Sequence, residues 1–406
     1  MRIAIVGTSN SLRKDGYTFY LGADPRVESL SNFSIGASTG LHSIRSTKNI
    51  DFSQFDYCLI DFSVNEEVVR KNNALNLEFS KTIFENLIVR CLAGGCIPVL
   101  TLLPRMTDTH QSKMRSFYLK ISADWGIPYF DGYDLIDYMK SVSDISGFGF
   151  FLDVAHIRPW VSLVFARSLL DGLASLPEQR LVAREVAAPS FACIGVADRL
   201  AGTEGLEITE RGSARASGRF VRSTEPATIS LHEIDGEDVI GVCVNLSETN
   251  CILALSGENE TALDLRNNYF ENPLYRLVIS ALPLMNVVTL TDGYLQIRSL
   301  DADGAASLTM ISGMSAELGH ASRPAKGQIE IADLFVRERG EVHSPNAPVD
   351  GLNRPLLLPS SHSGIELAAG VYRSLFSKEH DEAEGTAGRA RAREKRRQKM
   401  RAAARA

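Results

Sequence analysis

The sequence predicts a two-domain protein in which a three-layer α/β domain with a parallel sheet precedes an all-β domain. The chain has 406 residues, more than most single domains contain. In the first third, short and almost continuous apolar runs alternate with helical patterns, as expected for strands that helices cover on both faces. After about residue 180 the helical periodicity disappears and short strand-like segments follow one another.

Four apolar runs are expected to form the strands of the first domain: residues 2–6, 57–62, 97–103 and 127–130. Helices are expected between and after them, at about 66–92, 111–124 and 159–173. In the longest of these, apolar residues recur every three to four positions, and Pro159 suits the first turn of the last one. Repeated βα units imply a parallel sheet with right-handed crossovers.

Six segments rich in Val, Ile, Leu and Thr indicate the strands of the second domain: 227–233, 239–246, 251–256, 276–283, 286–290 and 294–300. Turn residues separate them, for example Ser256-Gly257-Glu258-Asn259 and Thr291-Asp292-Gly293. A sandwich-like all-β domain is the expected result. The predicted organisation is an α/β domain at 1–178, a β-rich domain at 188–340, a loop and short helix at 341–377, and a tail at 378–406.

The tail is of low complexity and is expected to be disordered. An acidic patch at 379–384 precedes a run of Ala, Arg and Lys at 389–406, with almost no large apolar side chain to bury. Two interpretations stay open. The basic run either contacts RNA, an acidic membrane surface or an acidic partner, or it only keeps the protein soluble.

Composition and cysteine usage indicate a cytoplasmic protein. Hydrophobic residues make up 44%, charged residues 23%, and the net charge is −6, which argues against a nucleic-acid binder as a whole. The sequence shows no signal peptide and no apolar run of the ~18 residues that span a membrane. Six cysteines lie in apolar stretches without a CxxC pair or His/Cys ligand spacing, which predicts buried free thiols and no metal site.

A serine follows the first predicted strand, in the segment Gly7-Thr8-Ser9-Asn10-Ser11. In an open parallel sheet, ligands bind at the carboxyl ends of the strands. A helix N-terminus beside this serine would supply backbone N–H groups for a developing oxyanion. Ser9 is therefore a candidate nucleophile, although the turn also suits a phosphate-binding loop or an ordinary strand–helix connection.

Asp153 and His156 lie just before the last helix of the first domain. A serine hydroxyl needs a base to take its proton, and a neutral imidazole suits that role near pH 7. The imidazole in turn needs an acceptor that fixes its tautomer, and an Asp three residues earlier can reach its other ring nitrogen. The alternative interpretation is a capping aspartate and a surface histidine, neither of them catalytic.

Asn65 follows the strand at 57–62 and has two compatible interpretations. It is a candidate N-cap of the long helix, with the acidic pair Glu66-Glu67 favouring the positive end of that helix. It is also a candidate side-chain donor to the same oxyanion.

The order of these segments along residues 1–175 resembles that of the SGNH/GDSL hydrolases. Gly7-Thr8-Ser9-Asn10-Ser11 is similar to their Gly-Asp-Ser block, and the resemblance implies Ser9 as the nucleophile. Asp153 and His156 match the last block of the family. The resemblance implies a flavodoxin-like three-layer fold and catalysis without a cofactor.

Two further blocks imply the oxyanion hole, together with the backbone N–H of Ser9. The segment 32–39 resembles the second block, whose glycine donates a backbone N–H; Gly36 is the match, or Ala37 in an alignment shifted by one. Ser63-Val64-Asn65-Glu66 is similar to the Gly-x-Asn-Asp block and implies Asn65 as the side-chain donor.

The sequence departs from the family at two positions. Thr8 replaces the usual Asp before the nucleophile, and Ser63 replaces the glycine two residues before the Asn. Neither position supplies a catalytic group. Arg105 and Arg158, beside the predicted site, are candidates for binding an anionic part of the substrate, or they are ordinary ion-pairing or capping arginines.

The sequence thus predicts a serine esterase that deacylates, and most simply deacetylates, a carbohydrate or a related small ester. An O-acyltransferase on a glycan would use the same residues, with a sugar hydroxyl in place of water. A non-catalytic scaffold that binds a glycan or a protein is the alternative from another class. A nucleotide-binding domain is disfavoured, because no glycine-rich phosphate loop follows the first strand.

Overall fold

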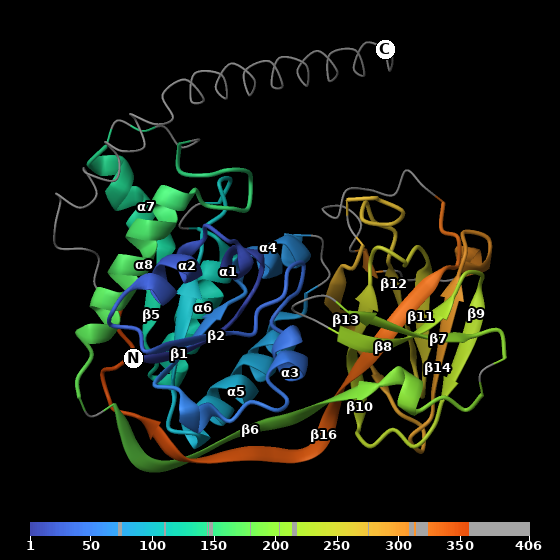
Figure 1. Ribbon diagram of the computed structural model, residues 1–406. Helices are drawn as coiled ribbons and strands as arrows, with labels where there is room; N and C mark the ends of the chain where they lie inside the picture. The colour runs from blue at the N-terminus through green and yellow to red at the C-terminus, as the bar shows by residue number, and fades with distance from the viewer. Residues whose placement is uncertain are drawn as a thin grey trace.

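The computed structural model describes residues 1–356, except for 72–74, 109–110, 144, 146–148, 179, 203, 213–216, 275, 308–311 and 314–323 (Figure 1). Two domains lie side by side, an α/β domain and a domain of β-sheets. The predicted tail at 378–406 and the short helix near 364–376 lie outside the described residues.

The α/β domain contains a five-stranded parallel sheet in the order β2-β1-β3-β4-β5. Its strands are β1 (Arg2–Gly7), β2 (Ser29–Asn32), β3 (Tyr57–Asp61), β4 (Ile97–Leu102) and β5 (Tyr129–Asp131). Its helices are α1 (Ser9–Leu12), α2 (Tyr17–Ala23), α3 (His42–Ser46), α4 (Ser63–Lys71), α5 (Leu77–Ala93), α6 (Lys113–Trp125), α7 (Gly132–Ser141) and α8 (Pro159–Ala174). This strand order is the flavodoxin-like arrangement.

Alternate residues of the central strands pack on opposite faces of this sheet. Ile3 and Ile5 belong to an apolar cluster with residues of α2, α7 and α8. Ala4 and Val6 belong to a second cluster with residues of α5 and α6. The sheet is therefore covered on both faces, which explains why its strands are nearly continuous apolar runs.

Several elements of this domain differ from the sequence-based expectation. The expected helix over 66–92 is two helices, α4 and α5, because Asn76 caps the start of α5 by accepting a hydrogen bond from the Phe79 N–H at 3.2 Å. Strand β2 was not expected because its Ser-Leu-Ser-Asn sequence lacks an apolar run. Helices α2, α3 and α7 were also not expected.

The second domain contains two sheets, as predicted for a sandwich. The six-stranded sheet has the order β13-β10-β16-β8-β7, with β6 also paired to β16; the five-stranded sheet has the order β15-β12-β11-β14-β9. The strands are β6 (Leu181–Gly195), β7 (Glu207–Gly212), β8 (Ser217–Ser223), β9 (Ala227–Leu231), β10 (Asp238–Asn245), β11 (Ile252–Ser256), β12 (Glu260–Asp264), β13 (Ile279–Thr289), β14 (Leu295–Leu300), β15 (Ser312–Gly313) and β16 (Ile329–Pro348).

The predicted turns of this domain lie where expected. Residues 256–259 connect the antiparallel strands β11 and β12. Asp292 and Gly293 both have positive φ, 51° and 74°, between β13 and β14, which suits a turn that needs two left-handed residues. The segments 276–283 and 286–290, expected as two strands, are largely one strand, β13.

A ribbon of two long antiparallel strands, β6 and β16, joins the domains (Figure 1). Residues 341–348, expected as loop, are the second half of β16, because they pair with the first half of β6. After β16 the chain returns to the first domain. There the backbone N–H of Tyr129 in β5 donates to the Arg354 carbonyl at 3.3 Å, and the Leu356 N–H donates to the Tyr129 carbonyl at 2.8 Å. The bounds 1–178 and 188–340 stay predictions; residue 188 lies inside β6.

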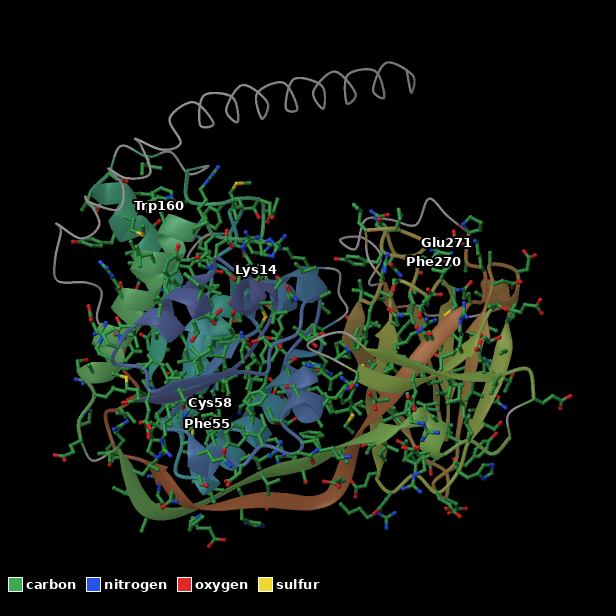
Figure 2. All side chains as sticks on the ribbon, in the orientation of Figure 1. Lys14, Phe55, Cys58, Trp160, Phe270 and Glu271 are labelled. Atoms are coloured by element: carbon green, nitrogen blue, oxygen red, sulfur yellow. The ribbon has the colours of Figure 1, made fainter. Side chains whose placement is uncertain are left out.

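All six cysteines are free and buried, as expected. Cys58, for example, lies in the interior of the α/β domain (Figure 2). Among the described residues, no helix is long and apolar enough to cross a membrane.

Candidate active site

Ser9 is the first residue of α1, directly after the end of β1. It is half-buried, whereas Thr8 before it and Asn10 after it are buried. Gly7 permits this tight turn, because a Cβ atom there would lie 2.7 Å from the Ser11 Oγ and 2.9 Å from the Asp61 carbonyl oxygen. The turn therefore presents the Ser9 hydroxyl at the carboxyl end of the first strand, β1, as the sequence predicts.

Asp153 and His156 lie at the tip of a small hairpin. Phe151 and Ile157 form its antiparallel bridge, and the Leu152 N–H donates to the His156 carbonyl at 2.8 Å. These backbone hydrogen bonds close the turn and so fix the backbone positions from which the two side chains extend.

Two hydrogen bonds attach the tip of this hairpin to the strand ends. The Asn10 amide donates to the Ala155 carbonyl at 2.9 Å, and the Met106 N–H donates to the Val154 carbonyl at 2.9 Å. The first of these bonds connects the residue after Ser9 directly to the residue before His156. The serine turn and the histidine hairpin are thus held together independently of their own side-chain contact.

Ser9, His156 and Asp153 form a continuous hydrogen-bonded chain. The Ser9 Oγ lies 2.9 Å from the His156 Nε2, and the His156 Nδ1 lies 2.9 and 2.8 Å from the two carboxylate oxygens of Asp153. With Asp153 ionised, Nδ1 carries the proton and Nε2 faces the hydroxyl as the acceptor. This is the geometry that a serine nucleophile and its base require.

Asp153 is held in its ionised form at a position that water reaches. Its side chain is 55% exposed and that of His156 is 24% exposed. Burial opposes ionisation, but the backbone N–H of Ala155, the His156 side chain and its charge, and the His156 backbone N–H together lower the pKa of Asp153 below its usual range. Those N–H groups lie 2.8 and 3.0 Å from Oδ1. The carboxylate is therefore available to stabilise an imidazolium.

The predicted oxyanion loop lies against the serine. A Cβ atom placed on Gly36 would lie 3.9 Å from the Ser9 Cβ, so the Gly36 backbone is adjacent to the nucleophile. Ala37 has a φ of 56°, a left-handed conformation that costs a non-glycine residue ~1 kcal/mol or more and persists only when its surroundings hold it. The Gly36 backbone therefore lies beside Ser9, while the choice of Gly36 or Ala37 as the oxyanion donor stays a prediction.

Asn65 lies in α4 and reaches the same loop. Its amide donates to the Ser38 carbonyl at 3.0 Å. It is the third residue of α4, so the interpretation of Asn65 as a helix N-cap is wrong. Ser63 begins α4 and exchanges two hydrogen bonds of 3.1 Å with the Leu103 backbone. Ser63 thereby attaches the start of α4 to the segment that follows β4.

Two buried carboxyl groups behind the site were not expected. Asp61, at the end of β3, is fully buried and accepts a 2.7 Å hydrogen bond from the Ser11 hydroxyl; burial raises its pKa to about 7. Glu66 is 1% exposed and accepts hydrogen bonds of 3.1 Å from the Gly40 N–H and the Tyr118 hydroxyl; burial raises its pKa to about 8. In the sequence, the position of both residues beside a predicted strand end was the indication that could have pointed to them.

Glu66 makes the stability of the protein depend on pH. Between about pH 4.5, its ordinary pKa, and about pH 8, the folded protein holds a proton on Glu66 that the unfolded chain releases. The free energy of unfolding therefore decreases as pH rises through this window, by at most ~1.4 kcal/mol per pH unit. In Glu66→Gln this contribution is absent, and we expect urea denaturation between pH 5 and 8 to show a flatter profile than the wild type. Equal slopes for the two proteins would contradict the assignment; Asp61→Asn is the companion variant.

The two candidate arginines have different surroundings. Arg105 is 8% exposed and lines a cavity of about 200 Å³ together with Met106, Tyr133 and Phe151. Arg158 donates from Nε to the Phe151 carbonyl at 3.1 Å and so supports the hairpin that carries His156. Substrate binding by either arginine stays a prediction.

Comparisons with known proteins agree with this architecture. No protein-family model and no curated protein matches the sequence. The chain is similar to the crystal structure of a two-domain esterase active on acetylated mannans, at 12% sequence identity and a TM-score of 0.50; the likeness covers 84% of this chain and 92% of that one. The same esterase co-crystallized with mannopentaose gives a TM-score of 0.53 at 13% identity, with the same coverage.

A third solved structure, an acetylxylan esterase from Geobacillus stearothermophilus, matches 42% of this chain and 92% of its own, with 14% identity and a TM-score of 0.34. The likeness to the two-domain esterase shows the fold. It is a flavodoxin-like α/β domain with a parallel sheet followed by an all-β domain. The fold class predicted from the sequence is confirmed.

Proposed function

We propose that this protein is a serine esterase that removes acyl groups, most simply acetyl groups, from a carbohydrate through an acyl-Ser9 intermediate. The observation that carries the proposal is the hydrogen-bonded chain from the Ser9 hydroxyl through His156 to Asp153, with distances of 2.9 and 2.8 Å. Two segments far apart in the sequence, the turn after β1 and the hairpin at 151–157, have to converge to produce it. A surface histidine with a capping aspartate would not require a serine within hydrogen-bond distance at the end of β1.

In the first half of the reaction, the His156 Nε2 takes the hydroxyl proton while the Ser9 Oγ attacks the ester carbonyl carbon. The carbonyl oxygen gains the electron pair and becomes an oxyanion. It accepts hydrogen bonds from the backbone N–H groups of Ser9 and Gly36 and from the Asn65 amide. An amide has two N–H donors, so the bond of Asn65 to Ser38 leaves a second one for the oxyanion.

The intermediate then breaks the bond to the alcohol, and the leaving oxygen takes the proton from His156. Acyl-Ser9 remains. Water attacks the acyl carbon while His156 removes its proton, and collapse releases the carboxylic acid and returns the proton to Ser9. Asp153 stabilises the imidazolium in both halves without itself becoming protonated.

The carbohydrate part of the proposal rests on the fold. The esterase that shares both domains with this chain acts on acetylated mannans. An acetyl group on a sugar hydroxyl is also a small ester that suits a half-buried serine. The substrate class is therefore an O-acetylated oligo- or polysaccharide.

A fluorophosphonate probe and acetate release test the proposal together. The wild-type protein should be labelled by the probe and should release acetate from acetylated mannan or xylan; Ser9→Ala should do neither. Ser141→Ala, an exposed serine of α7, is the matched control and should behave as the wild type.

Absence of labelling at every pH between 6 and 9 would contradict catalysis by Ser9 and would favour the non-catalytic scaffold. Transfer of acetyl to an added unacetylated glycan, without acetate release, would contradict hydrolysis and identify an acyltransferase.

A further inference from the structure

The outer edge of β13 contacts the first domain. In the part of the chain that the structure describes, β13 is the terminal strand of the six-stranded sheet and pairs only with β10. Such an edge exposes N–H and C=O groups that need other partners. At Ala281 both groups find them in the α/β domain: the N–H donates to the Ser38 Oγ at 3.3 Å, and the carbonyl accepts from the Thr39 Oγ1 at 3.4 Å.

The residue before Ala281 adds a third contact. The Ser280 hydroxyl donates to the carbonyl oxygen of Ala37, the residue with the left-handed backbone beside Gly36. Ser280 itself is fully buried. The second domain therefore holds Ala37, the residue with the left-handed backbone, through a hydrogen bond to its carbonyl oxygen.

Helix α4 holds the same loop from the opposite side. Asn65 donates to the Ser38 carbonyl, and Glu66 accepts from the Gly40 N–H, at 3.0 and 3.1 Å. The loop at 36–40 is thus clamped between α4 of one domain and β13 of the other.

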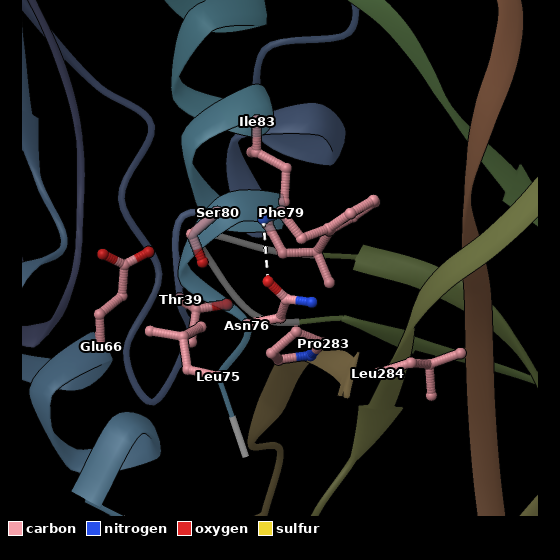
Figure 3. A pocket seen from close by; sticks show the side chains of 10 residues that line it. Thr39, Glu66, Leu75, Asn76, Phe79, Ser80, Ile83, Pro283 and Leu284 are labelled. Carbon is pink, nitrogen blue, oxygen red and sulfur yellow. Dashed lines mark hydrogen bonds between the residues drawn. The ribbon is translucent and has the colours of Figure 1, made fainter. Parts of the chain in front are cut away.

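The two domains are closely packed next to this clamp. Between them, a cavity of only about 10 Å³ is lined by Thr39 and Glu66 of the first domain and by Pro283 and Leu284 of β13, among others (Figure 3). That volume is about what a single water molecule needs, so the space between the domains here is too small for a larger molecule.

Apolar packing and one ion pair fix the interface further. Leu41 and Ile44 of the first domain belong to one buried cluster with Ala281 of β13. Arg45 lies 2.7 Å from Asp333 of β16, with both side chains less than a fifth exposed. The strand that bonds to the loop therefore cannot move away from it without breaking this packing.

We propose that Ser280 is a positioning residue of the active site, and that the β domain completes the esterase by holding the oxyanion loop at 36–40 in its donating conformation. Ser280 does not touch the substrate; it acts through the Ala37 peptide. The inference rests on the proposed serine-esterase function. It assigns the β domain a role in the transition state, separate from any binding of the glycan.

The kinetic test compares Ser280→Ala with Ser280→Thr and Ser299→Ala. We expect Ser280→Ala to lower kcat for aryl acetate hydrolysis about tenfold, less than the loss of a whole oxyanion donor, with KM within twofold of the wild type. Ser280→Thr retains a hydroxyl on a strand residue and should recover most of kcat. Ser299→Ala removes an equally buried serine from β14 in the other sheet and should leave kcat unchanged.

Hydrogen exchange provides a second readout on the same variants. The peptide covering residues 36–40 should exchange faster in Ser280→Ala than in the wild type, and at the wild-type rate in Ser299→Ala. A kcat within twofold of the wild type in Ser280→Ala, or an equal loss in Ser299→Ala, would overturn the positioning role. A wild-type protein that no fluorophosphonate labels would instead overturn the proposed function, so the two failures are distinguishable.

Discussion

Replacing Ser9 with alanine is expected to lower kcat for ester hydrolysis by ~10⁴- to 10⁶-fold, the loss typical of a serine enzyme without its nucleophile. The fold should survive, because Ser9 is half-buried at the surface and its hydroxyl bonds to His156 at the tip of a hairpin. That hairpin keeps its separate bond to Asn10. We expect the Tm to change by no more than a few degrees, as measured by thermal unfolding beside steady-state kinetics.

The double variant Ser9→Ala/His156→Ala provides the control. If Ser9 and His156 act as one unit, replacing His156 lowers kcat hardly any further once Ser9 has been replaced. The double variant should therefore retain the residual activity of Ser9→Ala. Losses that multiply would show that the two side chains act separately, against the assigned mechanism.

Asp153→Asn should produce the second largest loss, ~10³- to 10⁴-fold in kcat. Oδ1 of Asp153 accepts the backbone N–H groups of Ala155 and His156, so the asparagine is expected to keep its oxygen there. Its NH₂ group would then face the His156 Nδ1 and force that nitrogen to accept. The proton would move to Nε2, which could no longer take a proton from Ser9.

A charge control accompanies this variant. In this control, Asp171→Asn removes an exposed aspartate of α8 that pairs with Arg26. Its kcat should stay at the wild-type value. A loss in Asp153→Asn of less than tenfold would mean that Asp153 only closes the hairpin. Since the backbone bonds persist in the variant, its thermal stability should stay close to that of the wild type.

The candidate active site could be predicted from the sequence because each of its parts is local. Ser9 follows an apolar run by a few residues, and Asp153 and His156 are three residues apart. Strand ends of a parallel sheet meet at one edge, which is enough to bring the two parts together. The structure places the Ser9 Oγ and the His156 Nε2 in hydrogen-bond contact across 147 residues of chain.

What could not be predicted depends on tertiary contacts. Glu66 looks like an exposed acid at a helix start, yet it is buried because Gly40 and Tyr118 supply donors from distant segments. The contact of Ser280 with Ala37 joins residues 243 positions apart, and no local pattern encodes it. Strand β2 is polar in sequence and becomes a strand only because β1 offers it a partner.

The ribbon of β6 and β16 also affects how the protein is made. During synthesis, β6 leaves the ribosome long before β16, and the segment that bonds to Tyr129 of β5, residues 354–356, follows later still. The α/β domain therefore emerges with the edge at β5 open and with the apolar surface of Leu41 and Ile44 uncovered. Pairings between such distant segments form slowly, and an exposed edge and an apolar patch are where nascent chains aggregate. We therefore expect folding of the α/β domain to be completed only after β16 and residues 354–356 have been synthesised.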